Sequence, residues 1–206
     1  MSNAPKQARS TASTNRMLDA GESLMREGGA RAVTVEAVTR RSETSMSSFY
    51  ARFESIDGFF RALHDRFLDH VVDENLFPQL EDAISEPDLD SAIHAFVHRL
   101  LVTQHDHRDA AAFFIFSNPA DSLMREQGAK ISRAYSELLY RLVKAHRSEV
   151  SHKNLRLASD FAAMLVAGIG YEGLLHEPGE LTGRPRSTSQ IINSTSQAVV
   201  AYLKYG

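Results

Sequence analysis

Residues 34–60, TVEAVTRRSETSMSSFYARFESIDGFF, predict two short helices joined by a tight turn, followed by the start of a third helix. Each helix opens on a hydroxyl side chain, Thr34, Ser45 or Ser55, the residue type that caps the free amides of a first turn. The second helix has one large inward residue, Phe49, and hydroxyl groups elsewhere. Two short capped helices with hydroxyl and basic groups on their exposed faces are typical of a helix-turn-helix reader of the DNA major groove.

Eight residues of this stretch stand at an ungapped spacing: Thr34, Val35, Val38, Ser45, Phe49, Tyr50, Phe53 and Ser55. In these places the sequence resembles the N-terminal motif of the tetracycline-repressor (TetR) family of bacterial transcription regulators, T-V-x-x-I-A-x-x-A-G-V-S-x-G-x-L-Y-x-Y-F-x-S-K-x-x-L. The chain departs from that motif at Glu43 (a turn glycine), Ser47 (a recognition-helix glycine), Arg52 (commonly an aromatic) and Ile56 (a lysine that contacts phosphate). Glu43 must therefore form the turn without the conformational freedom of glycine.

Composition is typical of a soluble cytoplasmic protein. The chain has 206 residues and no cysteine, which excludes disulfides and thiol catalysis. It has no apolar run of about 18 residues and no apolar signal core near its start, so we expect neither a membrane span nor secretion. The net charge of −3 gives no sign of nucleic-acid binding. Residues 1–66, however, carry ten Lys/Arg against eight Asp/Glu, whereas the remainder carries 13 against 18.

The periodicity of apolar residues predicts an all-α protein of about nine helices in two parts. Residues 1–55 form the helix-turn-helix domain, and residues 56–206 form an effector-binding and dimerisation domain. Residues 1–12 are expected to form a flexible arm, which either has no function or contacts DNA phosphates. The apolar segment AAAFFIF (110–116) is interpreted as a short buried helix stopped by Asn118-Pro119. Phe77-Pro78 and the acidic, proline-bearing segment 81–90 are interpreted together as a break. Further helices are predicted over 14–27, 56–74, 90–104, 120–146, 154–176 and 189–205.

The residues expected to contact DNA fall into three groups. Side chains at the start of the second helix should reach base edges, and these are Ser45, Met46, Ser47 and Ser48. Thr34, Tyr50 and Arg52 match motif positions and carry hydrogen-bond donors, so we expect them to contact DNA phosphates. Alternatively, Tyr50 is a half-buried aromatic residue of the core. Arg40 and Arg41 add positive charge. The recognition helix has no arginine among its base-reading positions, so no operator sequence is predicted.

A homodimer is expected, because a helix-turn-helix protein usually pairs to read a two-fold operator. The two C-terminal helices are the predicted interface, which the resemblance also implies as a four-helix bundle. Its candidate residues are Ala167, Gly168, Gly170, Leu174, Ile191, Val199 and Leu203, with a purely intramolecular core as the alternative.

The resemblance further implies an apolar cavity among the middle helices that binds a small effector. The candidate wall residues are His94, Phe96, His98, Phe113, Phe114, Phe116, Tyr135, Met164 and Tyr171, each of which plain core packing would also explain.

Two alternatives compete with a ligand-responsive repressor. His94 and His98 share a helical face at a spacing that metal sites use, but no third ligand or catalytic motif accompanies them. We therefore expect no enzyme, no metal and no cofactor. In the other alternative the C-terminal domain only dimerises or binds a protein partner, without a small molecule. The sequence favours a dimeric repressor of double-stranded DNA, released by a small apolar effector.

Overall fold

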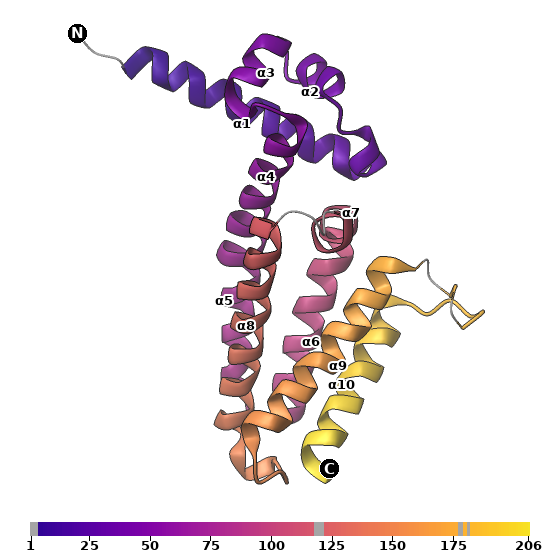
Figure 1. Cartoon of the computed structure of the whole chain (residues 1–206). Coiled ribbons are helices and arrows are strands. Elements are labelled where there is room, and N and C mark those ends of the chain that lie inside the picture. Colours follow the sequence, from indigo (N-terminus) through magenta and orange to yellow (C-terminus); the bar gives the residue numbers. More distant parts are fainter. Residues whose placement is uncertain (1–3, 118–121, 177–178, 181) are drawn as a thin grey trace.

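The computed structural model describes residues 4–117, 122–176, 179–180 and 182–206, and throughout these ranges the chain forms helices and turns without a strand. A small N-terminal bundle caps one end of a long helical body (Figure 1). Among the described residues the α-helices are α1 to α10, and α4 and α5 are parts of one continuous helix, which leaves nine separate units. The predicted all-α class and the number of helices are therefore confirmed.

The N-terminal bundle is built from three helices, α1 (Ala4–Gly28), α2 (Val35–Arg41) and α3 (Met46–Phe53), with a 3₁₀ turn at Ala30–Ala32 after α1. Their apolar faces close one core together with the next helix. The fully or nearly fully buried members are Met17, Leu18, Leu24, Met25, Val33, Val38, Phe49, Phe53, Phe59 and Leu63. Apolar residues at helical spacing on α1 and the next helix thus form one small core.

Helix α1 begins at Ala4 rather than at Thr14, so residues 4–12, which we expected to form a flexible arm, are helical. The segment has no helix-breaking residue after Pro5, and proline is tolerated in a first turn because its missing amide needs no partner there. Further along α1, a Cβ on Gly21 would lie 2.7 Å from Cζ of Phe59. The glycine thus allows α1 and the connector helix to approach closely.

A continuous connector helix joins the two parts of the chain. It comprises α4 (Ile56–Phe67), a π-helical stretch (Leu68–Leu76) and α5 (Phe77–Asp82). The part of the predicted break at Phe77-Pro78 is therefore wrong, whereas the part at 81–90 is confirmed, since α5 ends at Asp82 and the next α-helix begins at Leu89. Proline disrupts an α-helix because its ring meets the carbonyl of residue i−4 and its amide is missing. Here Pro78 follows directly on the wider π-helical turns, in the first turn of α5, where those two conflicts are relieved.

The body is formed by α6 (Leu89–Asp106), α7 (Arg108–Ala112), α8 (Ser122–Ala145), α9 (Leu155–Leu175) and α10 (Thr188–Tyr205), packed against the connector. A 3₁₀ turn (Ala83–Ser85) precedes α6, and another (Arg147–Glu149) follows α8. The segment AAAFFIF is helical as predicted, ending in a π-turn at Phe113–Ser117, but it is only half-buried and Ile115 is exposed. The predicted stop at Asn118-Pro119 lies outside the described residues.

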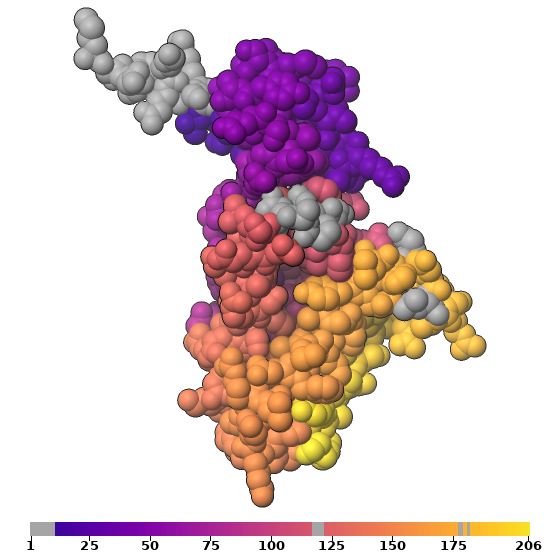
Figure 2. Space-filling model, in the orientation of Figure 1, coloured from indigo at the N-terminus to yellow at the C-terminus, as the bar shows by residue number. Residues whose placement is uncertain are grey.

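Helix α9 is the most apolar helix of the body, and within the described ranges it is the one helix long and apolar enough to cross a membrane by length and composition. One side of it packs against α6, α8 and α10, as a core helix does. Its other side is not buried: Leu157, Phe161, Met164 and Leu175 are exposed, with Met164 at 71%. In Figure 2, α9 lies in orange on the face of the body turned to the viewer.

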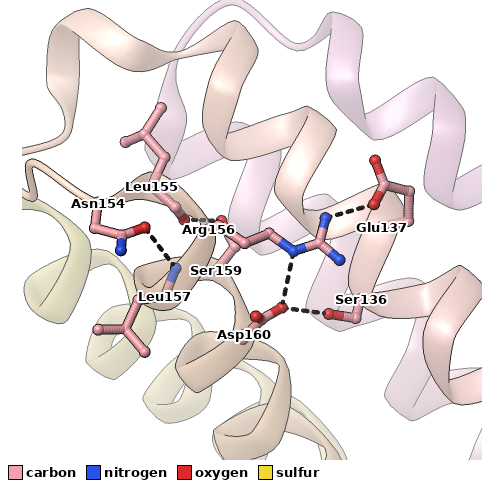
Figure 3. Close-up of polar contacts among 8 residues, drawn as sticks. All are labelled: Ser136, Glu137, Asn154, Leu155, Arg156, Leu157, Ser159 and Asp160. Carbon is pink, nitrogen blue, oxygen red and sulfur yellow. Dashed lines mark hydrogen bonds and ion pairs between the residues drawn. The ribbon is translucent and has the colours of Figure 1, made fainter.

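Polar contacts at the start of α9 fix it against α8 (Figure 3). Asn154 caps α9 by accepting a hydrogen bond from the amide of Leu157 at 3.1 Å. Arg156 pairs with Glu137 of α8, and its Nε lies 3.5 Å from Asp160, whose carboxylate also accepts a hydrogen bond from Ser136 at 2.9 Å. The Leu157 side chain points away from this network (Figure 3).

Candidate DNA-binding surface

Both helices of the predicted reader begin at the residues that the sequence assigned as caps. The Thr34 hydroxyl accepts a hydrogen bond from the amide of Ala37 at 3.2 Å, which starts α2. The Ser45 hydroxyl accepts one from the amide of Ser48 at 3.1 Å, which starts α3. These bonds satisfy amides that have no partner inside the helix, and each cap typically stabilises its helix by about 1 kcal/mol. The Thr34 and Ser45 hydroxyls therefore have a structural role within the protein.

The turn between α2 and α3 is closed by hydrogen bonds rather than by a glycine. Glu43 adopts a left-handed backbone with φ of 53°, the conformation that glycine takes without strain. The amide of Thr44 donates to the carbonyl of Thr39 at 2.9 Å, and the hydroxyls of Ser42 and Thr44 lie 2.7 Å apart. Arg16 of α1 donates to the Ser42 carbonyl at 3.2 Å. Sequence reasoning missed Arg16, because nothing local marks its reach across 26 residues.

The start of α3 presents an exposed polar surface. Ser45, Met46 and Ser47 are exposed, Ser48 is half-buried, and the Ser45 hydroxyl donates to the Ser48 hydroxyl at 3.0 Å. Tyr50 is 50% exposed, with its ring edge against the buried Phe49 at 5.6 Å between centroids. Tyr50 thus contacts the core through Phe49 while half of its surface remains exposed. The structure brings these predicted contact residues together on one side of the bundle.

Two of the predicted basic contacts are held by the protein itself. Arg41 makes a bidentate ion pair with Glu27 of α1, at 2.7 Å for each nitrogen, and also donates to Ser23. This guanidinium holds the pKa of the Glu27 carboxyl below its ordinary value. Arg52 donates to Thr14 of α1 at 3.0 Å and to the carbonyl of Ser48 at 2.8 Å. Both arginines therefore fasten the reader to α1.

Arg40 differs from these two arginines. It lies in the last turn of α2, is exposed, and makes no side-chain ion pair within the described part of the chain. Ile56, at the motif's lysine position, packs against the bundle core and supplies no charge.

Residues 17–63 match the model of the family described as "Bacterial regulatory proteins, tetR family". The matched segment contains the C-terminal part of α1, all of α2 and α3, and the first two turns of α4, with the capped turn and exposed α3 surface described above. The chain therefore contains a DNA-binding domain of the TetR family at residues 17–63. It is a DNA-binding transcriptional regulator and not an enzyme.

Solved structures extend the likeness in fold from this domain to the body of the chain. A TetR/AcrR-family regulator from Thermobifida fusca is 17% identical, with a TM-score of 0.67 over 91% of this chain and 96% of that one. A TetR regulator from Haloarcula marismortui is 13% identical, with a TM-score of 0.68 over 94% and 97%. A transcriptional regulator from Rhodococcus sp. RHA1 is 16% identical, with a TM-score of 0.68 over 94% and 98%. At these identities the likeness shows the fold. No curated protein matches the sequence.

The predicted wall residues of the effector cavity do not form one group among the described residues. Phe96 and Tyr135 pack together in the body core at 5.3 Å, and Phe116 contacts Tyr171 at 5.8 Å. Phe113 and Phe114 instead face the connector helix, where they contact Phe60 and Phe67.

The remaining three of those residues lie nearer the surface. His94 and His98 stack at 6.1 Å, and His94 shares a hydrogen bond of 3.1 Å with Asn193 of α10. Met164 is exposed on the outer side of α9. The described residues contain no group of three or more His, Asp or Glu side chains placed to hold a metal ion.

The predicted dimer residues divide into two sets. Gly170, Leu174, Val199 and Leu203 are buried within the chain itself, and a Cβ on Gly170 would meet the Gln104 side chain at 2.2 Å. Gly168 is exposed with open space above it, and Ala167 and Ile191 are half-buried. The residues of the first set recur with the helical period of the core. From the sequence alone, such residues could not be distinguished from residues on an exposed face of the same helix.

Proposed function

We propose that this TetR-family regulator is a dimeric repressor that reads a palindromic operator with α3 and is released by a small apolar effector. The observation that carries the proposal is the exposed first turn of α3. Its backbone is fixed by the Ser45 cap and the closed turn, while Met46, Ser47 and Tyr50 face outward. A rigid helix start with outward hydroxyl and methyl groups suits contact with base edges in the major groove. We propose a repressor because repression requires only that the protein occupy a promoter.

Within this surface we assign different roles to different residues. Met46, Ser47 and Ser48 reach base edges, whereas Tyr50 and Thr34 contact phosphate oxygens. Arg40 supplies the electrostatic contact, since it is exposed in the last turn of α2. Arg41 and Arg52 act indirectly, because their guanidinium groups hold α2 and α3 against α1. As a regulator of DNA occupancy, the protein would work in the cytoplasm.

The exposed apolar side of α9 supports the proposal of a dimer. Leu157, Phe161, Met164, Gly168 and Leu175 follow one another at spacings of three, four and seven residues, which places them on one helical face. A continuous exposed apolar stripe of this kind marks a protein interface. Packing α9 and α10 against the same helices of a second copy would bury it, and a two-fold pair presents two readers to two half-sites.

Two buried polar atoms in the body support the proposal that a small effector binds there. The hydroxyl of Tyr135 and the side-chain oxygen of Gln104 are buried and have no hydrogen-bond partner among the described residues. Burial also raises the pKa of the Tyr135 phenol, so it stays a neutral donor. A buried polar atom without a partner costs roughly 1–3 kcal/mol, and a ligand that supplies the missing hydrogen bond would recover that cost.

The proposal is tested by binding to a pool of genomic DNA fragments under a salt titration. We expect selective retention of a few fragments, lost in Tyr50→Ala and kept in Tyr205→Ala, whose tyrosine is exposed on the body. Arg40→Ala should reduce the slope of log K against log salt concentration by about 1 for each phosphate contact removed. Arg41→Ala should instead lower stability and leave the slope unchanged. Equal retention of all fragments by the native protein and Tyr50→Ala would refute the proposal.

A further inference from the structure

Helix α2 ends in a Schellman motif that has a glutamate in place of the usual glycine. The amide of Thr44 donates to the carbonyl of Thr39 at 2.9 Å, and the amide of Glu43 donates to the carbonyl of Arg40 at 3.4 Å. These two hydrogen bonds define the motif, which places a left-handed residue directly after the helix. Glu43 is that residue, with φ of 53°. The turn that leads into α3 therefore depends on a backbone conformation that glutamate adopts only with strain.

The motif leaves the carbonyl of Ser42 without a partner inside α2. The last four carbonyls of a helix are not reached by its own amides, and the two bonds of the motif use only those of Thr39 and Arg40. Arg16 of α1 supplies a donor, because its Nε donates to the Ser42 carbonyl at 3.2 Å. A cation is favoured there, since the carbonyl end of a helix carries partial negative charge.

Holding this carbonyl fixes the peptide plane between Ser42 and Glu43. The plane turns when ψ of Ser42 and φ of Glu43 change together, so the movement that takes the carbonyl away from Arg16 also takes Glu43 out of the left-handed region. The strain at Glu43 favours that movement. The hydrogen bond from Arg16 opposes it. Arg16 thus stabilises the one turn conformation that the missing glycine would adopt without strain.

The same short segment of α1 also holds the far end of α3. Arg52, in the last turn of α3, donates to the Thr14 hydroxyl at 3.0 Å. Residues 14–16 of α1 therefore contact both the turn before α3 and the last turn of α3. In Figure 1, α1 passes beneath both helices of the reader. This part of α1 is anchored in the bundle core by Met17, which is fully buried, so Arg16 acts from a fixed position.

We propose that Arg16 is a positioning residue for DNA recognition. It keeps Glu43 left-handed by holding the Ser42 carbonyl, and so it sets the direction in which the first turn of α3 leaves the bundle. The inference rests on the function proposed above, in which Met46 and Ser47 read base edges. Base-edge contacts require a defined direction, whereas phosphate contacts carry no sequence information. Loss of Arg16 therefore reduces selectivity for the operator more than affinity for DNA in general.

The test compares binding to one fragment selected from the genomic pool with binding to an unrelated duplex of equal length. Arg16→Ala should weaken binding to the selected fragment by about tenfold or more, and binding to the unrelated duplex by no more than about twofold. Glu43→Gly should restore selective binding to within about threefold in the double variant, because glycine adopts positive φ without strain. Arg133→Ala removes the same charge from the exposed side of α8 and should bind both DNAs as the native protein does.

A second control separates positioning from stability. Ile192→Val removes a methyl group from the body core, where Ile192 is 3% exposed, and so it lowers the stability of the chain without touching the reader. It should keep the native selectivity. Thermal melts verify that every variant is folded at the temperature of the binding assay.

Hydrogen exchange at the Thr44 amide, followed by NMR, tests the turn without DNA. This amide should exchange about tenfold faster or more in Arg16→Ala, because its bond to the Thr39 carbonyl opens when the turn relaxes. The double variant with Glu43→Gly should return to the native rate. If the native protein selects no fragment, the proposed function fails, while the exchange rate still decides whether Arg16 holds the turn.

Three results would overturn the inference. Equal losses on both DNAs, with a slope of log K against log salt concentration lower by about 1, would make Arg16 a phosphate contact. A double variant as weak as Arg16→Ala would show that Arg16 does not act through Glu43. Native selectivity or native Thr44 exchange in Arg16→Ala would show that the turn keeps its conformation without this hydrogen bond.

Discussion

Glu43 shows how a single backbone angle constrains the reader. Its φ of 53° lies in the left-handed region, where an L residue other than glycine, asparagine or aspartate is strained by roughly 1–2 kcal/mol. Its side chain is exposed, so no packing contact compensates for that strain. The surrounding hydrogen bonds from Thr44 and Arg16 hold the conformation instead. The turn therefore keeps helix-turn-helix geometry at a cost in stability.

Substitutions at Glu43 should separate this backbone strain from side-chain effects. Glu43→Gly removes the strain but adds freedom to the unfolded chain, so we expect a change between zero and about 1 kcal/mol of stabilisation. Glu43→Val should destabilise by more than 1 kcal/mol, because β-branched residues are the least compatible with positive φ. Urea unfolding at one fixed protein concentration measures both. Equal stabilities for the two variants would show that the left-handed turn carries no strain.

The arginines mark the limit of sequence reasoning at this scale. The caps Thr34 and Ser45 were predictable, since capping depends on neighbours within three residues. The roles of Arg41 and Arg52 were not, because their partners Glu27 and Thr14 are 14 and 38 residues away. A basic residue in a motif position is compatible with a phosphate contact and with an ion pair to α1. Only the packing of α1 distinguishes the two.

At the scale of elements, most helices follow from apolar periodicity and caps, and the errors lie where several turns must be considered together. Pro78 signals a break in any local window, yet the π-helical turns before it let the connector continue to Asp82. Helix α9 shows the opposite limit. Its sequence is apolar on most sides, but composition does not tell which apolar side the fold leaves outward.

The corner between α3 and the connector provides a test at this scale. A Cβ on Gly58 would lie 2.0 Å from the carbonyl oxygen of Phe53, so the first turn of α4 must move if a side chain is added. We expect Gly58→Ala to destabilise by about 1–3 kcal/mol, the usual cost of overpacking. Gly128→Ala is the control: this glycine lies within α8 with open space around it and should gain up to about 1 kcal/mol.

Thermal and urea unfolding measure both glycine variants, and circular dichroism shows whether helix content is kept. A Gly58→Ala variant as stable as the native protein would mean that the connector shifts freely relative to α3. The tilt of the reader would then not be fixed by this corner.

At the scale of the whole molecule, the sequence could not separate core residues from the residues of the proposed interface between two copies. Core and interface residues on α9 and α10 share the same apolar chemistry and the same helical period. Gly170, Leu174, Val199 and Leu203 are used inside the chain, so the surface available to a second copy is centred on Met164 and Gly168. The network around Arg156 fixes that surface relative to α8.

Met164→Glu should convert the proposed dimer to a monomer. A carboxylate at the centre of an apolar interface would have to be desolvated without a partner, which costs far more than an exposed charge. The substitution should leave the fold intact, because the Met164 side chain is 71% exposed. Leu123→Glu, at an exposed leucine outside the α9 stripe, is the matched control and should remain dimeric. Analytical ultracentrifugation measures the mass of each species.

A monomeric Met164→Glu should also lose most of its affinity for a two-fold operator, since one reader contacts only a half-site. A Met164→Glu variant that remains a dimer would place the contact between copies elsewhere than on the outer side of α9.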